Sequence, residues 1–296
     1  MIRIYRYGEI PNEEIFARVS PMSNVEDAVA EIIKGVRERG DEALFEYSLK
    51  FDKASLASLE VSKEEIEEAI EAADPFFLEI LKKAAENIRT FHENQKRSGF
   101  RSYGRDGIVL GQKIMAIEKA GIYVPGGTAA YPSTVLMDAI PAKIAGCKEI
   151  VMVTPPRADG KVGPDILAAA YVAGVDRIFK IGGAQAIAAL AYGTESVPRV
   201  DKIVGPGNAY VAEAKKQVFG QVSIDMIAGP SEILVVADGK SDPCVVAADM
   251  LSQAEHDKIA SAVLVTDSME LAKAVQAELE RQLSLLEREA DRKSVV

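Results

Sequence analysis

Two side chains near residue 255 have the types and the spacing to hold a metal ion. Gln253 and His256, in the stretch LSQAEHDK, are three positions apart. In a helix this spacing puts both side chains on one face, with Cβ atoms about 5–6 Å apart, so that both could reach one ion. Imidazole nitrogen is a good zinc ligand, whereas a neutral amide oxygen is a rare one. On spacing alone, the simpler interpretation is a polar helix end whose histidine complements the helix dipole.

The rest of the chain supplies few further ligands. The other histidine, His92, falls in a helical region, where a surface or capping role would also explain it. Cys147 and Cys244 lie in apolar segments and form no CxxC pair, so we expect buried free thiols rather than a disulfide or a cysteine zinc site. A catalytic zinc takes at least three protein ligands, so this shell would need carboxylates, His92 or residues that the chain does not contain.

Glycine-rich loops are the second feature that could carry chemistry. Each follows an apolar run that reads as a strand, and in α/β sheets ligands gather at the carboxyl ends of strands. The four loops are YVPGGTAAYPST (123–134), KIGGAQAIAAL (180–190), VGPGNAYV (204–211) and IAGPSEILVV (227–236). Together they predict a crevice for an anionic ligand such as a dinucleotide. Each loop alone is better explained as a tight turn, because none has a GxGxxG or Walker A pattern, and only the four loops together make the ligand site an equal alternative.

The elements that must position these loops follow from the hydrophobic periodicity. Residues 23–97 are helical almost throughout, with helices over 63–73, after a Ser62 cap with Glu65, and over 75–95. One apolar stripe of this region consists of Val25, Val29, Ile32, Ile33 and Val36.

From about residue 108, short strands alternate with helices. The strands are expected at 119–125, 149–156, 176–183, 201–207, 221–227, 232–238 and 261–267. The helices between them are expected to begin near Thr134, Pro164, Ala184, Tyr210, Pro243 and Met269, with Asp242 capping the fifth. This order predicts an α/β fold with a parallel sheet and helices on both faces. The chain ends on an apolar stub after a long helix, so we expect a further strand to belong there.

Composition narrows the class of protein. The chain has 296 residues, enough for one or two domains, with 48% hydrophobic and 27% charged residues. No apolar run approaches the roughly 20 residues of a membrane span, and the first residues lack the apolar core of a secretory signal, so we expect a cytoplasmic protein. The net charge of −10 disfavours binding to nucleic acid or an anionic membrane and favours a small-molecule ligand.

Several long strings, taken in order, resemble the histidinol dehydrogenase family over essentially the whole chain. They are GDEAL, YVPGGTAAYPSTVLM, GGAQAIAALAYGT, VDKIVGPGNAYVAEAK, IDMIAGPSEILVVAD and LSQAEHD. The resemblance implies a homodimeric enzyme with one zinc ion per subunit. It further implies oxidation of L-histidinol to L-histidine through L-histidinal by two NAD molecules in succession, which are the last steps of histidine biosynthesis.

The resemblance also implies roles for individual residues. Zinc would be held by Gln253 and His256, with an Asp and a second His from a later part of the family sequence. The same two residues and Ser231 would contact substrate. NAD would be contacted at three positions: Tyr123, Gln185 and Asn208. The family's proton-transferring Glu-His pair also comes from its later part, so the resemblance gives this chain no catalytic residue and predicts little or no activity.

The family fold implies two incomplete Rossmann-like domains. One would combine 1–122, with its helical N-terminal part, and 232–296, and the other would be 123–231. Two other functions fit the same loops. The chain could come from a related NAD-dependent dehydrogenase of another small alcohol, such as a sulfonated diol, or from a noncatalytic homologue that serves as a binding or scaffold protein.

Overall fold

The computed structural model describes residues 2–15, 25–126, 131–227, 232–254 and 260–285. The chain divides into two compact units, the larger Met22–Ile227 and the smaller Met1–Pro21 with Ala228–Val296. Residues 22–122 and 123–227 therefore belong to one unit, and the division into two Rossmann-like domains stays a prediction.

The larger unit contains a five-stranded sheet in which all neighbouring strands are parallel. The strand order is β5-β4-β3-β6-β7, which places β3 in the centre. The strands are β3 (Lys119–Tyr123), β4 (Glu149–Thr154), β5 (Arg177–Lys180), β6 (Lys202–Val204) and β7 (Ser223–Ile224). Each lies where the sequence predicts a strand.

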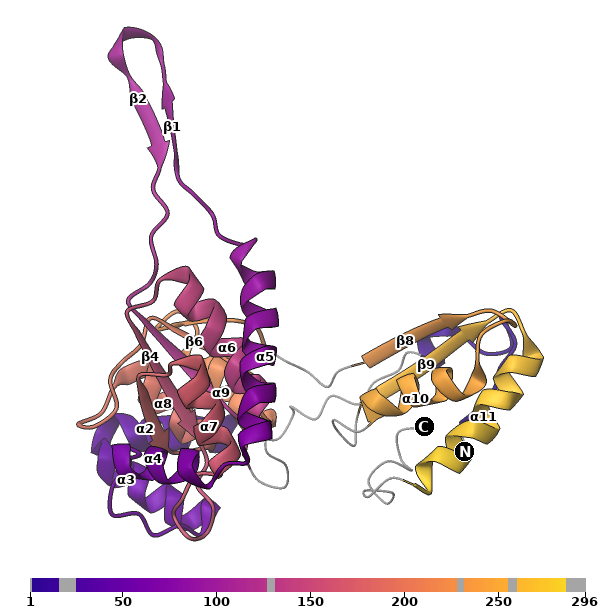
Figure 1. Ribbon diagram of the computed structural model, residues 1–296, viewed down its shortest axis with the longest axis horizontal. Helices are drawn as coiled ribbons and strands as arrows, with labels where there is room; N and C mark the ends of the chain where they lie inside the picture. Colours follow the sequence, from indigo (N-terminus) through magenta and orange to yellow (C-terminus); the bar gives the residue numbers. More distant parts are fainter. Residues whose placement is uncertain (1, 16–24, 127–130, 228–231, 255–259, 286–296) are drawn as a thin grey trace. The chain divides into compact units, whose positions relative to one another are not determined.

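Helices cover both faces of this sheet (Figure 1). On one face lie α2 (Glu26–Arg39), α3 (Asp41–Tyr47), α8 (Gly183–Tyr192) and α9 (Ala209–Val218), and on the other α4 (Lys63–Ala72), α5 (Pro75–Glu93), α6 (Pro132–Ala145) and α7 (Pro164–Ala173). A short π-helix, η2 (Ser48–Asp52), follows α3. The predicted α/β class with both faces covered is confirmed.

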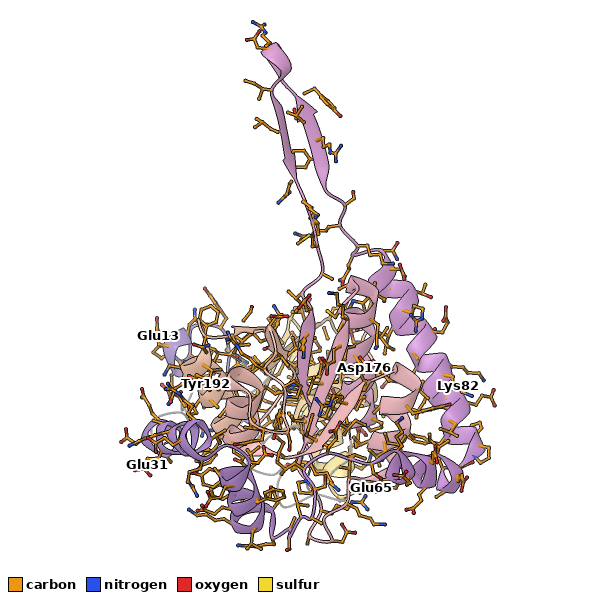
Figure 2. All side chains as sticks on the ribbon, turned by 90° about the vertical axis from the view of Figure 1, so that its left-hand side faces the viewer. Glu13, Glu31, Glu65, Lys82, Asp176 and Tyr192 are labelled. Atoms are coloured by element: carbon orange, nitrogen blue, oxygen red, sulfur yellow. The ribbon has the colours of Figure 1, made fainter. Side chains whose placement is uncertain are left out.

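The sheet has an apolar core on each face, because the side chains of successive strand residues point to opposite faces. Tyr123 and Val153 join the core beneath α2 and α8, whereas Ile122 and Met152 join the core beneath α6 and α7. The predicted stripe from Val25 to Val36 is buried in the first core. In contrast to these buried side chains, the labelled Lys82 on α5 points away from the sheet (Figure 2).

The cap that the sequence predicts at Ser62 is present. The Ser62 side chain accepts a hydrogen bond from the Glu65 N–H at 3.2 Å, and the Glu65 carboxylate accepts one from the Ser62 N–H at 2.9 Å. This reciprocal pair is the predicted capping box at the start of α4.

A hairpin that the sequence analysis did not predict follows α5. Strands β1 (Phe100–Tyr103) and β2 (Val109–Gln112) are antiparallel, and all eight of their residues are exposed. The turn between them contains Asp106 and Gly107 with positive φ of 60° and 76°, the conformation that tight hairpin turns require. An Asp-Gly pair between apolar runs is a hairpin signal, so this element was predictable. In Figure 1 the hairpin extends beyond the end of α5.

The smaller unit is built on two parallel strands, β8 (Glu232–Ala237) and β9 (Ser261–Thr266). Its other elements are α1 (Asn12–Ile15), α10 (Pro243–Ala254) and α11 (Met269–Leu283). The two long helices form an apolar cluster that consists of Val246, Ala247, Met250, Leu251, Leu271, Val275 and Leu279. The predicted cap of α10 is confirmed, because the Cys244 N–H donates to Asp242 Oδ1 at 2.8 Å.

One prediction about the cysteines is wrong. Cys147 is buried as expected, but Cys244 is exposed. Cys244 is the second residue of α10, in the first turn, and the α10 residues that reach the core begin with Val246.

Among the described residues, no helix is both long and apolar enough to cross a membrane.

Candidate ligand-binding site

The larger unit contains a cavity of about 890 Å³ at the carboxyl ends of β3, β4, β5 and β6. The chain leaves β3 toward β4 on one side, and later enters β6 on the other side of β3. Such a reversal of strand order leaves a crevice at the carboxyl ends of the strands, where open α/β sheets bind ligands. Its polar, charged and aromatic lining residues include Phe51, Asp52, Tyr123, Arg157, Gln185 and Asn208.

Tyr123 and Gln185 stand together at the inner wall of the cavity. Tyr123 ends β3, and its hydroxyl oxygen accepts a hydrogen bond from the Gly183 N–H at 3.1 Å. The pKa of Tyr123 is raised to about 12, chiefly by burial; the Gly183 hydrogen bond opposes this rise and the charge of Asp52 contributes to it. Gln185 lies in the first turn of α8 and is only 2% exposed. An alanine Cβ at Gly183 would lie 2.8 Å from Gln185 Oε1, so the bare backbone leaves space for this amide.

Asn208 reaches the cavity from the loop after β6. Its side-chain oxygen accepts hydrogen bonds from the N–H groups of Tyr210 at 3.1 Å and Val211 at 3.2 Å, so it caps α9. The amide NH₂ group is therefore the part of Asn208 that remains for a ligand. The structure thus brings all three predicted cofactor residues, Tyr123, Gln185 and Asn208, to one cavity.

A buried cation holds the loop that carries Asn208. Lys215, on α9, is 2% exposed, and its ammonium group donates to the Gly205 carbonyl oxygen at 3.0 Å. Lys215 also forms an ion pair with Asp225, whose carboxylate accepts a hydrogen bond from the Gly205 N–H at 2.9 Å. Both peptide groups of Gly205 are therefore fixed by one ion pair.

A second carboxyl group, that of Asp138 on α6, lies beside this ion pair. The pKa of Asp138 is raised to about 7, chiefly by burial and also by the negative charge of Asp225, while the charge of Lys215 opposes the rise. Its Oδ2 is buried and accepts no hydrogen bond from any described residue. The group therefore changes charge near neutral pH, next to the Gly205 loop.

Three residues of the cavity were missed by the sequence analysis. Phe51 and Asp52 come from η2, in a region interpreted only as helical, and Arg157 follows β4. Burial raises the pKa of Asp52 to about 6. The sequence held a signal for Arg157, since Arg157 directly follows the strand predicted at 149–156. It held none for Phe51 and Asp52, because the chain reaches the cavity there from far away in sequence.

The predicted metal and substrate residues are only partly described. Gln253 lies in the last turn of α10, and its buried Nε2 has no hydrogen-bond partner among the described residues. Ser231 and His256 lie outside the described residues. The remaining histidine, His92, is paired locally, with its Nδ1 2.7 Å from Gln95 Oε1. Within the described ranges, no group of three or more His, Cys, Asp or Glu residues could hold a metal ion.

Comparison with known proteins adds what geometry alone does not give. The profile of the histidinol dehydrogenase family matches residues 17–295. Histidinol dehydrogenase of Lactiplantibacillus plantarum is 56% identical over 266 residues, which are 90% of this chain and 62% of that protein. That of Clostridium acetobutylicum is 52% identical over 293 residues, 97% of this chain and 68% of that protein.

A solved structure supports the same relationship. The crystal structure of histidinol dehydrogenase from Elizabethkingia anophelis matches with a TM-score of 0.91 at 39% identity, over 96% of this chain and 66% of that one. The chain therefore spans a little under two thirds of the length of the first curated relatives that it matches.

The fold and the cavity define the class, an α/β protein with a ligand site at the reversal point of a parallel sheet. Within that class, the chain belongs to the histidinol dehydrogenase family.

Proposed function

We propose that the protein to which this chain belongs oxidises L-histidinol to L-histidine through L-histidinal, with NAD as oxidant and one zinc ion per subunit. The observation that carries the proposal is the convergence of Tyr123, Gln185 and Asn208 on one cavity of about 890 Å³. Ligand sites for small molecules have volumes of roughly 300–1,000 Å³, so a cofactor fits the space.

The chain's own residues suit a dinucleotide in this cavity. The N-termini of α8 and α9 both adjoin it, through Gly183 and Asn208, and helix N-termini favour phosphate groups. Arg157 adds a positive charge at the same cavity. The NH₂ groups of Asn208 and Gln185 can donate to carbonyl or ribose oxygens, while the buried wall around Tyr123 excludes water.

The residues of the smaller unit suit one half of a zinc site. The buried amide nitrogen of Gln253 has no partner among the described residues. Because amide oxygen and nitrogen are exchanged by a flip, this position can equally present an oxygen ligand. Gln253 and His256 would hold the ion, and Ser231 would contact substrate. A bound zinc ion would act as a Lewis acid and a template that orients the substrate alcohol.

The test is a pair of binding measurements on the chain itself. We expect NAD binding by calorimetry to be lost in a Gln185→Ala, Asn208→Ala double variant, and zinc retained after dialysis to be lost in Gln253→Ala and in His256→Ala. His92→Ala is the matched control, because His92 is half-buried and bonded locally to Gln95. Equal zinc content in wild type and both variants, or NAD binding unchanged in the double variant, would contradict the proposal.

We further propose that the intact protein is a homodimer and that the β1-β2 hairpin contributes to the contact. Phe100, Tyr103 and Leu110 on this hairpin are 60%, 75% and 67% exposed. A two-stranded hairpin is marginally stable alone, and a cluster of exposed apolar side chains marks an interaction surface.

Sedimentation equilibrium tests the dimer. We expect wild type to self-associate, and Leu110→Asp to weaken association at least tenfold. Tyr171→Asp serves as control, because Tyr171 is also a largely exposed apolar residue, at 60%, but lies on α7. A strictly monomeric wild type, or equal association of all three proteins, would rule out this role of the hairpin.

A further inference from the structure

Three ionisable side chains meet at the loop after β6, and only one of them is a cation. Lys215 of α9 is 2% exposed and forms an ion pair with Asp225, the residue that follows β7. Asp138 of α6 lies at the same loop, since an added Cβ at Gly205 would be 3.1 Å from Asp138 Oδ2. These three side chains, which we call the Gly205 cluster, therefore join α6, α9 and the end of β7 at one point.

The Gly205 cluster determines the position of a loop that reaches the cavity. The Lys215 ammonium group donates to the Gly205 carbonyl oxygen at 3.0 Å, and the Asp225 carboxylate accepts a hydrogen bond from the Gly205 N–H at 2.9 Å. Three residues further along the chain, Asn208 caps α9 and lines the cavity. A change in the charge of the cluster is therefore transmitted to the cavity through a few residues of backbone.

The Gly205 cluster has one carboxyl group more than its cation can neutralise. The buried Oδ2 of Asp138 accepts no hydrogen bond from any described residue. The pKa of this group is raised to about 7, chiefly by burial and also by the charge of Asp225, while the charge of Lys215 opposes the rise. The lysine of α6 itself, Lys143, is paired with Asp176 at 2.8 Å.

The other ionisable groups around α6 are exposed, paired or on the opposite face of the sheet. The elements that pack most closely against α6 are α5, α7, β3 and β4. His92 is bonded to Gln95, Lys119 pairs with Glu149, and the Tyr123 side chain lies in the core on the opposite face. The remaining ionisable side chains of these elements are exposed: Glu79, Lys82, Lys83, Glu86, Arg89, Glu93, Asp165 and Tyr171. Within the described part of the chain, the charges that act on Asp138 are therefore those of Asp225 and Lys215.

Loss of the Asp138 proton to solvent changes the charge of the cluster. While Asp138 is protonated, Lys215 neutralises Asp225 and the cluster has no net charge. Once Asp138 is ionised, two carboxylates compete for one ammonium group in a poorly hydrated site. The new carboxylate obtains hydrogen-bond donors either from Lys215 or from water that enters when the loop opens. Both outcomes weaken the contacts that hold Gly205.

The direction of the pH dependence follows from the raised pKa of Asp138. Opening of the loop hydrates this carboxyl group and returns its pKa toward about 3.9, the value of an exposed aspartate. The closed loop is therefore fully favoured below about pH 4, where Asp138 is protonated in both states. This advantage is lost as the pH rises to about 7, and it does not change further above that pH.

We propose that the Gly205 cluster is a pH-sensitive switch, in which protonated Asp138 leaves Lys215 and Asp225 to hold the loop that carries Asn208, and ionised Asp138 releases that loop. Asp138 is thus a positioning residue, because it acts on the cavity through the loop. The switch itself stands on the contacts of the cluster, whereas its effect on the affinity for NAD rests on the proposed function.

Hydrogen exchange followed by mass spectrometry of the whole chain tests the switch. After correction for the intrinsic exchange rate, we expect the protection of residues 204–211 to fall at least about tenfold from pH 5 to pH 8 in wild type. Asp138→Asn, which stays uncharged, should keep the protection of pH 5 at pH 8. Asp165→Asn, at an exposed aspartate of α7, is the matched control and should behave as wild type.

Calorimetry with NAD adds a readout that a merely structural role of Asp138 would not give. At pH 8 Asp138→Asn should bind NAD at least about fivefold more tightly than wild type, because its loop stays in place, and at pH 5 the two affinities should be equal. A residue that only fills space would instead weaken binding at both pH values when it is changed.

The outcomes separate the switch from the proposed function. Protection of 204–211 that is the same at pH 5 and pH 8 in wild type would overturn the switch, and this measurement needs no variant that might misfold. Equal pH dependence in wild type and Asp138→Asn, or equal or weaker NAD binding by that variant at pH 8, would also overturn it. Failure of wild type to bind NAD while the exchange still depends on pH would contradict the proposed function and leave the switch supported.

Discussion

Replacement of Lys215 by methionine is expected to lower the free energy of unfolding of the larger unit by about 3–5 kcal/mol. Methionine has a similar length and fills the same space, so the loss comes from charge and not from a cavity. Without the ammonium group, Asp225 keeps a charge beside buried Asp138 with no cation to offset it, and the Gly205 carbonyl loses its donor. Urea denaturation followed by circular dichroism measures the change.

The loss of unfolding free energy in Lys215→Met should be larger at pH 8 than at pH 5. Burial already raises the pKa of Asp138 to about 7 in the wild type, where Lys215 lowers it, so the variant raises that pKa further. At pH 5 Asp138 is protonated in both proteins, and only the Lys215–Asp225 pair is lost. At pH 8 the wild type can hold a second carboxylate next to Lys215 and the variant cannot, so the difference in unfolding free energy should be larger there.

Lys148→Met is the matched control for Lys215. Lys148 also forms an ion pair, with Glu118, but the two side chains are 76% and 69% exposed. Exposed pairs contribute about 0–1 kcal/mol, so this variant should unfold almost as the wild type does. Equal effects of the two substitutions, or a loss at Lys215 that does not grow with pH, would refute the role given to the buried cation.

Gly205→Ala is expected to destabilise the larger unit by about 3 kcal/mol or more and to abolish NAD binding in this cavity. Gly205 has a φ of 114°, which side chains rarely adopt, and an added Cβ would lie 2.2 Å from the Tyr123 carbonyl oxygen. That oxygen belongs to the backbone of the central strand and cannot move away cheaply. The loop would shift instead, together with Asn208. Denaturation and calorimetry on the same preparation measure both effects.

Gly220→Ala is the control that distinguishes the backbone strain of a positive φ from a steric clash of the added Cβ. Gly220 has a similar φ of 97°, but nothing lies within 4 Å of an added Cβ. This control should cost only the conformational strain of a positive φ, roughly 1–2 kcal/mol, and leave NAD binding intact. Equal losses of unfolding free energy in Gly205→Ala and Gly220→Ala would show that the close approach of the loop to β3 does not contribute to the effect.

Local signals in the sequence account for the parts of the fold that were predicted correctly. Pro164 and Pro243 begin helices where expected, and the seven predicted strands all appear. Each of these signals acts within a few residues. The Asp-Gly turn of the hairpin is equally local, so its omission was an error of interpretation and not a limit of the sequence.

Long-range contacts account for what could not be predicted. The interaction of Lys215 with Gly205 and Asp225 spans ten residues in each direction, and nothing in AEAKKQV distinguishes Lys215 from its exposed neighbour Lys216. The approach of η2 to the ends of the strands is set by the packing of α2 and α3 on the sheet. The three predicted cofactor residues were proposed from a family resemblance, and their position in one cavity could be seen only in the structure.

The strand pair of the smaller unit has a consequence for handling the protein. One face of β8 packs on α10 and α11 through Val235 and Ala237, but Leu234 and Val236 on the other face are 58% and 74% exposed. Parallel strands are normally covered on both faces. An exposed apolar two-stranded ribbon whose outer edges pair with no other described strand is a template on which strands of other molecules can add. Concentrated solutions of the isolated chain are therefore where intermolecular β-structure should first appear, seeded at this ribbon.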